Sequence, residues 1–404
     1  MKILHCLAQL PMKTGSGVYF STVVNAMVHR NHENAVIYAE QPPFAINFEG
    51  VQKHYPVEFL TRELPFPIAG MSDEMPYPST VYSKMDEEMT TLWHDAFRRR
   101  LRLAKEEFRP DVVICHHLFL LTALVREVFP DTKLIGITHG TDLRQVRKHP
   151  RFRNHLSAIP TLDAFCSIAP KDAHEIRDIF GVAPSKIEVM GGGFNSEIFY
   201  EGRDEVLPGL NLMYAGKISP SKGVFELAKA TPLIAEKYPY VKVHIVGAAD
   251  EETKKELYRL AGGEENLAVY NAENQKLMAD QLRKMDVFVL PSYYEGLGLV
   301  AIEALACSVR TVATEIEGLM WLLGKEVADS GVIEYVALPK LYDVDKPYEE
   351  EKPAFVRRLA DKLLLQLDRI IAQESFPEEI KKEVRNHSWD HIMDRLEQRL
   401  QSLL

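Results

Sequence analysis

The sequence predicts an α/β protein built from two domains, each a parallel sheet with helices on both faces. Short apolar runs rich in β-forming residues alternate with longer helical segments, and this alternation begins again near residue 210. The 404 residues are enough for two domains of usual size, and the 46% hydrophobic content is normal for a chain that buries a sizeable core.

The first half of the chain contains a series of predicted strands. They lie at residues 2–8, 35–39, 111–115, 134–138, 164–168 and 187–190. Apolar spacing predicts helices between them, at 18–30, 86–107, 118–129 and 171–180. A glycine run at 191–193 ends this alternation, and we place the first domain at residues 1–200.

The alternation then restarts and predicts a second doubly wound domain at residues 201–388. Its strands are predicted at 210–215, 241–246, from Val269, at 286–290 and at 309–313, and its helices at 224–237, 251–260, 276–285 and 299–306. Beyond Tyr348 the chain is polar and helical. The last predicted helix, 389–404, carries its apolar residues along one stripe.

An irregular segment interrupts the first domain at residues 64–80. It holds four prolines together with Phe66, Met71, Met75 and Tyr77. A stretch of this length is usually functional or disordered, and its aromatic residues argue against disorder. We expect it to present apolar and aromatic surface. Shaping of a binding pocket and simple coverage of the domain are equally good explanations.

Composition narrows the classes of protein. The net charge of −10 is concentrated after residue 200, which disfavours a nucleic-acid partner. Basic clusters at 98–102 and 144–153 would suit an anionic membrane surface or ligand, although solvated helix faces explain them more simply. The amino terminus predicts a strand instead of a signal peptide. The four cysteines form no CxxC pair, which indicates a reduced cytoplasmic protein without a metal site.

The stretch from Pro291 to Cys307 combines a loop and a helix after a buried strand. Gly296 and Gly298 leave backbone amides uncovered just before the helix, and the positive end of the helix dipole points the same way. An anion is the natural occupant. Glu295 and Glu303 border this site and should face hydroxyls, because carboxylates repel phosphate. A nucleotide sugar offers both a diphosphate and hydroxyls.

These residues carry a resemblance to a known family. The pattern P-S-x-x-E-G-x-G-L-x-x-I-E-A-L-A, with Glu295 and Glu303 as its glutamates, resembles the signature of the retaining glycosyltransferases of family four. The segment Thr138–Asp142 is similar to the family's H-G-x-D element, in which the histidine, here His139, approaches the transferred sugar. A histidine directly after a strand faces the crevice where such sheets bind ligands.

Two further segments are similar to the family pattern. Gly15, Ser16 and Gly17 resemble the glycine loop that the family places beneath the donor diphosphate, although many Rossmann-type domains have such a turn. Tyr214–Gly223 matches the opening of the family's second domain, with Lys217 where arginine is usual and Lys222 at the usual lysine. Lysine keeps the charge but loses the two-pronged geometry, so phosphate binding should persist with looser geometry.

The resemblance implies a GT-B fold, in which two Rossmann-like domains face a central cleft. Residues 1–200 with the returning helix 389–404 would be the acceptor side, and 201–388 the nucleotide-sugar side. It also implies metal-independent, retaining transfer of a hexosyl group from a nucleoside diphosphate sugar to a hydroxyl of a glycan, glycolipid or small metabolite. UDP-sugars are favoured as donors ahead of GDP-mannose. The protein would be cytoplasmic, with the inner face of the membrane as a second location.

The resemblance also assigns roles to residues. The predicted catalytic residues are His139, Glu295, Lys217 and Lys222. The lysines and the amides of Gly296, Leu297, Gly298 and Leu299 would neutralise the leaving diphosphate without a cofactor. Glu303 is assigned to the ribose hydroxyls and Glu295 to hydroxyls of the transferred sugar. No carboxylate would act as a covalent nucleophile.

Other functions stay open at this point. A sugar phosphorylase or a nucleotide-sugar epimerase would share the GT-B fold. A dinucleotide-dependent oxidoreductase is disfavoured because Phe20 stands where the third glycine of G-x-G-x-x-G would lie, and Glu40 is a weak ribose ligand. A sugar-binding protein without catalysis is the remotest alternative.

Overall fold

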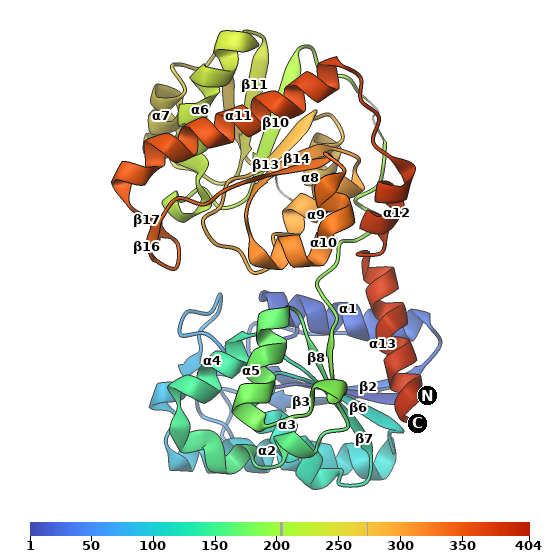
Figure 1. Ribbon diagram of the computed structural model, residues 1–404. Helices are drawn as coiled ribbons and strands as arrows, with labels where there is room; N and C mark the ends of the chain where they lie inside the picture. The colour runs from blue at the N-terminus through green and yellow to red at the C-terminus, as the bar shows by residue number, and fades with distance from the viewer. Residues whose placement is uncertain (203–204, 273) are drawn as a thin grey trace. The chain divides into compact units, whose positions relative to one another are not determined.

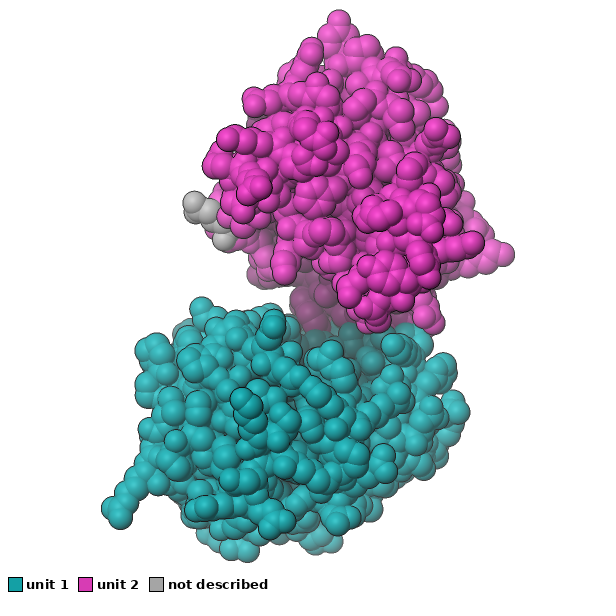
Figure 2. All heavy atoms as spheres, turned by 90° about the vertical axis from the view of Figure 1, so that its left-hand side faces the viewer, with its two compact units in different colours: residues 1–191, 392–404 teal, residues 192–391 magenta. Residues whose placement is uncertain are grey.

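The computed structural model describes residues 1–202, 205–272 and 274–404, which form two compact units (Figures 1 and 2). Unit 1 comprises Met1–Gly191 and Ile392–Leu404, and unit 2 comprises Gly192–His391. Each unit contains one large sheet whose described strand pairs are all parallel. The predicted α/β class, with a parallel sheet in each half, is confirmed.

The sheet of unit 1 has the strand order β3-β2-β1-β6-β7-β8-β9. Its strands are β1 Lys2–Leu7, β2 Glu33–Glu40, β3 Lys53–Glu58, β6 Val112–His116, β7 Lys133–Ile137, β8 Ala164–Ser167 and β9 Ile187–Val189. The order reverses between β1 and β6, because the chain leaves β1 toward β2 and later returns on its other side. In doubly wound sheets the crevice at the carboxyl ends of such a strand pair is the usual ligand site.

The helices of unit 1 lie close to their predicted positions, except for the one at residues 141–148, which was not predicted. They are α1 Gly15–His29, α2 Glu87–Glu107, α3 Leu120–Val128, α4 Thr141–Lys148 and α5 Pro170–Phe180. Helix α1 begins earlier than predicted because the Thr14 hydroxyl caps it, accepting from the Gly17 amide at 3.0 Å. Gly15, Ser16 and Gly17 therefore form the first helical turn instead of a loop.

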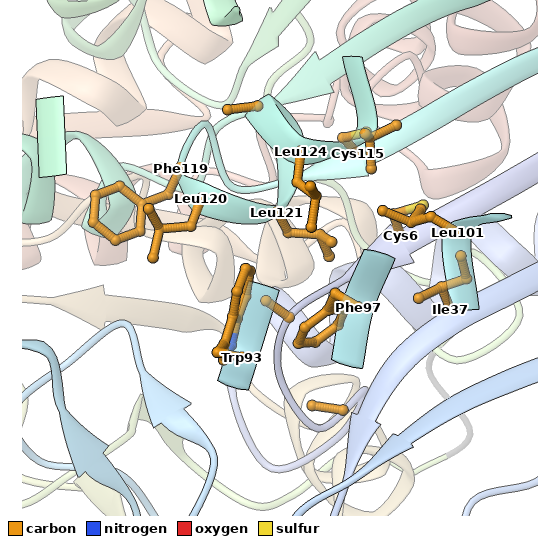
Figure 3. Packing of buried hydrophobic residues seen from close by; sticks show 14 of the residues in the cluster. Cys6, Ile37, Trp93, Phe97, Leu101, Cys115, Phe119, Leu120, Leu121 and Leu124 are labelled. Carbon is orange, nitrogen blue, oxygen red and sulfur yellow. The ribbon is translucent and has the colours of Figure 1, made fainter. Parts of the chain in front are cut away.

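The core of unit 1 is continuous from the sheet to helices α2 and α3. Trp93 and Phe97 of α2 lie beside Leu121 and Leu124 of α3 (Figure 3). All four cysteines are buried as free thiols.

The segment 64–80 belongs to this core. Phe66, Met71 and Tyr77 are buried in it and Met75 packs against it, so the expectation that they present apolar surface is wrong. Two short paired strands, β4 Ala69–Gly70 and β5 Thr80–Val81, order the segment. Burial of these side chains outweighs the irregularity of the backbone, which explains how so long a loop is held in place.

The last helix, α13 Trp389–Leu403, packs on unit 1 and lies beside α1 in Figure 1. Arg30 donates to Asp394 at 2.7 Å, and His32 contacts Glu397 at 2.8 Å. On the other side of the helix, Arg395 contacts Glu188 of β9 at 3.3 Å. The helix therefore returns to the amino-terminal half, as predicted.

The sheet of unit 2 has the order β12-β11-β10-β13-β14-β15 and reverses between β10 and β13. Its strands are β10 Leu210–Ala215, β11 Val241–Val246, β12 Leu267–Tyr270, β13 Val287–Leu290, β14 Arg310–Thr314 and β15 Ile333–Val336. Its helices are α6 Val224–Lys237, α7 Glu251–Leu260, α8 Gln275–Leu282, α9 Leu299–Ala306, α10 Glu317–Asp329, α11 Lys352–Ile371 and α12 Glu378–Arg385. A hairpin of β16 Leu341–Asp343 and β17 Lys346–Pro347 precedes α11.

Within the described ranges, no helix combines the length and the apolar character needed to cross a membrane. The basic cluster at 144–153 is partly neutralised, because Arg147 lies 3.8 Å from Glu175 and Lys148 pairs with Asp73. These contacts fit a solvated helix face.

Candidate active site

Two predicted motifs of unit 2 meet where its strand order reverses. The loop after β10 carries Lys217 and Lys222, and the loop after β13 carries Glu295, and β10 and β13 are neighbours in the sheet. The loops also touch, since the Tyr293 amide donates to the Ser221 carbonyl at 3.0 Å. The site predicted from two separate segments is thus one place at the carboxyl edge of this sheet, where doubly wound folds bind ligands.

Lys222 and Glu295 form an ion pair in this place. The Lys222 Nζ lies 2.7 Å from the Glu295 Oε1, and the Ser292 hydroxyl donates to the same oxygen at 2.8 Å. The lysine side chain is 26% exposed and the glutamate 22%, so both can still reach a ligand. Glu295 thus balances and orients the ammonium group of Lys222.

Lys217 lies in the same loop but has a different environment. Its side chain is exposed and has no ion-pair partner within the described residues. Its backbone is fixed, because the Tyr214 hydroxyl donates to the Lys217 carbonyl at 2.7 Å. Lys217 is therefore an exposed positive charge on an anchored loop.

The turn before α9 presents the amino terminus of that helix. Gly298 adopts φ +66, a left-handed conformation that favours glycine, and Leu299 begins the helix. A Cβ on Gly298 would lie 3.0 Å from the Leu290 side chain, whereas a Cβ on Gly296 would meet nothing within 4 Å. Gly298 is thus needed by the backbone, while Gly296 borders open space that a ligand can use. Leu297, predicted with them, is buried against Gly318 and Gly192.

Substitution of these two glycines separates their roles. We expect Gly296→Ala to leave the melting temperature unchanged but to weaken nucleotide binding roughly tenfold or more, because one methyl group would enter the ligand space. Gly298→Ala should instead lower stability by about 1 kcal/mol through backbone strain. Calorimetric titration with UDP and thermal melts of both variants measure the two effects. If both variants lost the same amount of melting temperature, the two glycines would not have the different roles assigned to them.

Glu303 is buried on α9 without a hydrogen-bond or ion-pair partner for its carboxyl group among the described residues. It is 7% exposed, and burial raises its pKa to about 8. The carboxyl group is therefore largely protonated at neutral pH in the ligand-free protein. A carboxyl group with few hydrogen bonds and little access to water is costly, and ligand hydroxyls would relieve part of that cost.

The raised pKa of Glu303 predicts how the stability of the folded state depends on pH. Because the folded-state pKa of about 8 exceeds the ordinary value of 4.5, the folded state holds a proton that the unfolded state has lost between these pH values. Stability should therefore fall as pH rises, by about 1.4 kcal/mol per pH unit from this group.

Glu303→Gln should remove that contribution. The variant should match the wild type near pH 4.5 and melt at a higher temperature near pH 8. The exposed Glu326→Gln is the matched control, because it removes a carboxyl group from the surface. If the difference between Glu303→Gln and wild type stays constant over this pH range, Glu303 does not hold the proton.

Unit 1 has its own polar cluster at the carboxyl ends of β6 and β7. His116 ends β6, His117 follows it, and His139 follows β7. Burial lowers the pKa of His139 to about 3, so this predicted catalytic residue is neutral at physiological pH. His139 can therefore exchange hydrogen bonds with a ligand, but it does not supply a positive charge.

Asp142 holds this cluster together, although it was not among the predicted site residues. It is fully buried and accepts from the Thr138 hydroxyl at 2.8 Å, the His139 amide at 3.0 Å and the Leu118 amide at 2.6 Å. These bonds tie the turn after β6 to the turn after β7. The D of the H-G-x-D pattern was the signal that could have identified it.

The glycines at the start of α1 also differ in role. A Cβ on Gly17 would lie 2.6 Å from the Met12 amide nitrogen, so Gly17 is required for close packing of the preceding loop. A Cβ on Gly15 would meet nothing within 4 Å. The Ser16 hydroxyl donates to the Gln9 side chain at 3.4 Å. Of the three predicted residues, Gly15 is the one that adjoins open space.

Family models match both halves of the chain. The model described as "Glycosyltransferase Family 4" matches residues 13–198, and "Glycosyl transferases group 1" matches residues 209–337. The two matches together span most of the chain and include every predicted site residue.

Curated relatives carry related names. A D-inositol 3-phosphate glycosyltransferase from Kribbella flavida is 27% identical over 179 residues, which cover 40% of this chain and 42% of that protein. A glycogen synthase from Mycobacterium tuberculosis is 28% identical over 253 residues, 56% of this chain and 58% of that protein. The matched region thus spans about two fifths to three fifths of these relatives.

Solved structures share the fold over the whole chain. A glycosyltransferase from Rickettsia africae superposes with a TM-score of 0.66 at 12% identity, covering 100% of this chain and 98% of that one. Anabaena Alr3699/HepE in complex with UDP and glucose superposes with a TM-score of 0.63 at 16% identity, covering 100% of both chains. At these identities the likeness establishes the fold alone.

Proposed function

Because this chain belongs to the group 1 glycosyltransferases, with the GT-B fold, we propose that it transfers a hexosyl group from a nucleoside diphosphate sugar to a hydroxyl acceptor with retention of anomeric configuration. The observation that carries the proposal is the Lys222–Glu295 pair at the strand-order reversal of unit 2, beside the open turn at Gly296. A cationic group, free amides and carboxyl groups stand together there. That combination suits a diphosphate flanked by two sugars.

The donor is assigned to unit 2. Lys217, Lys222 and the amides at the start of α9 would neutralise the diphosphate, which makes it a better leaving group. Glu303, which is buried on α9, would bond the ribose hydroxyls, and Glu295 would bond hydroxyls of the transferred sugar. In unit 1, His139 is assigned to the transferred sugar and Gly15 to the space near the diphosphate.

The reaction requires one bond exchange at the anomeric carbon. The bond from that carbon to the leaving phosphate oxygen breaks, and a bond to the acceptor oxygen forms on the same face of the sugar. The acceptor proton moves to the departing phosphate oxygen, so no enzyme carboxylate becomes a nucleophile. The family match favours this transfer over the oxidoreductase alternative. Phe20, which stands where the third glycine of G-x-G-x-x-G would lie, is buried in the core.

UDP is the preferred nucleotide in this proposal. The Anabaena structure contains UDP and glucose, and another similar structure, from E. coli, is described as bound with UDP-2-fluoro glucose. A thermal-shift screen of UDP, GDP and ADP sugars tests the choice. At about 100 times its Kd a ligand stabilises the folded state by about 2.7 kcal/mol, so UDP-sugars should raise the melting temperature most. A shift with nicotinamide dinucleotides alone would overturn the proposal.

Metal independence is a further part of the proposal. Turnover of the donor should continue in excess EDTA, because the two lysines and the α9 amides replace a divalent cation at the diphosphate. The measurement is the rate of UDP release with EDTA and with added Mg²⁺ or Mn²⁺. Activity that disappears with EDTA and returns with either metal would contradict this mechanism.

A further inference from the structure

His139 does not stand alone, because one of its ring nitrogens is already engaged. The His116 Nδ1 lies 3.1 Å from the His139 Nε2. The two rings are nearly parallel, with centroids 5.3 Å apart and an interplanar angle of 16°. Of the two nitrogens of His139, only Nδ1 is left for a ligand.

The surroundings fix this pair of rings. His116 is fully buried, and the Phe20 ring meets its ring edge-on at 5.1 Å. The Tyr19 ring meets the His139 ring edge-on at 5.2 Å, and the His117 ring packs against it at 4.9 Å. Neither ring can turn to a new partner without displacing these neighbours.

The proton between the two nitrogens can belong to either ring. If His139 Nε2 donates, the proton of neutral His116 sits on its Nε2, which is buried and has no hydrogen-bond partner in the part of the chain that the structure describes. If His116 Nδ1 donates, that buried Nε2 is only an unused lone pair. Orphaned buried N–H groups are rarer in native structures than under-satisfied acceptors, so the second arrangement is favoured. It leaves the proton of His139 on Nδ1.

We propose that His116 is a positioning residue that fixes His139 in the tautomer with its proton on Nδ1, so that His139 donates an N–H to a ligand oxygen and does not act as a base. The inference rests on the proposed function, in which His139 faces the transferred sugar. Asp142 supports the same geometry from the backbone, by accepting from the His139 amide at 3.0 Å.

Ring nitrogen NMR of the full-length protein tests the tautomer directly, with no substrate present. Long-range ¹H–¹⁵N spectra distinguish protonated from bare ring nitrogens, and His139→Gln and His116→Asn assign the signals. We expect His139 with a protonated Nδ1 and a bare Nε2. A proton on the His139 Nε2 would overturn the proposal, whatever donor or acceptor the protein uses.

A matched pair of variants tests whether positioning matters for turnover. In His116→Asn the amide nitrogen lies near the place of Nδ1 and can still donate, whereas His116→Phe keeps a ring without a donor. We expect UDP-sugar hydrolysis to fall about tenfold in kcat for the Phe variant, with the KM for the donor nearly unchanged, and the Asn variant to stay within about threefold of wild type.

Equal losses in both folded variants, or no loss in the Phe variant, would reject the positioning role. If the wild type hydrolyses no nucleotide sugar, the proposed function fails. The NMR result then decides the tautomer separately.

Discussion

Lys222→Ala and Glu295→Gln should each lower turnover by about 100-fold or more, the scale for losing one preorganised electrostatic group in an active site. In the first variant the leaving diphosphate loses its held ammonium group. In the second, the partner that lies 2.7 Å from that group is neutralised, and the contact to sugar hydroxyls is altered. Both residues are partly exposed, so both variants should fold. The measurement is kcat for UDP-sugar hydrolysis or transfer.

A lysine of the same unit provides the control. Lys237→Ala removes an ion pair with Asp368, between α6 and α11, away from the predicted site residues. It should leave kcat within about twofold of wild type, as surface ion pairs contribute little. Near-normal turnover in both Lys222→Ala and Glu295→Gln would show that this cluster is not the donor site.

Asp142→Ala should strongly destabilise unit 1. It removes the acceptor of two backbone amides and one hydroxyl in a fully buried place, and each orphaned donor costs about 1–3 kcal/mol. We expect the unfolding free energy to fall by about 3 kcal/mol or more. Differential scanning calorimetry of the full chain measures this loss.

The control for Asp142 is an exposed aspartate of unit 1. Asp178 lies on the exposed face of α5, and Asp178→Ala should change the melting temperature little. If Asp142→Ala has the same melting temperature as the wild type, the turns after β6 and β7 do not depend on the Asp142 carboxylate. His139 would then be held by other contacts.

The sequence predicted much of the fold because most elements are long and strongly patterned. β10, β11, α6, α7 and α9 have the predicted bounds. Strand β3 was missed because it is a sheet-edge strand, with charged ends and Pro56 inside it, which local propensity disfavours. Helix α10 was missed because Gly324 interrupts it with φ 69.

The residue types of the site were predictable, but their contacts were not. Lys222 and Glu295 are 73 positions apart in the sequence. They meet because β10 and β13, the strands that precede them, are neighbours in the sheet. Spacing alone also does not separate Gly15, next to open space, from Gly17, which packs on backbone. The burial of Glu303 and of segment 64–80 depends on tertiary packing, which no local pattern encodes.

The anomeric form of the first released sugar tests retaining transfer most directly, and it needs no knowledge of the acceptor. The substrate is the α-linked UDP-hexose that gives the largest thermal shift, with water as the acceptor in its slow hydrolysis. Time-resolved ¹H NMR then follows the anomeric proton before mutarotation. Retaining chemistry by the departing phosphate predicts the α-anomer first. Initial release of the β-anomer would contradict it.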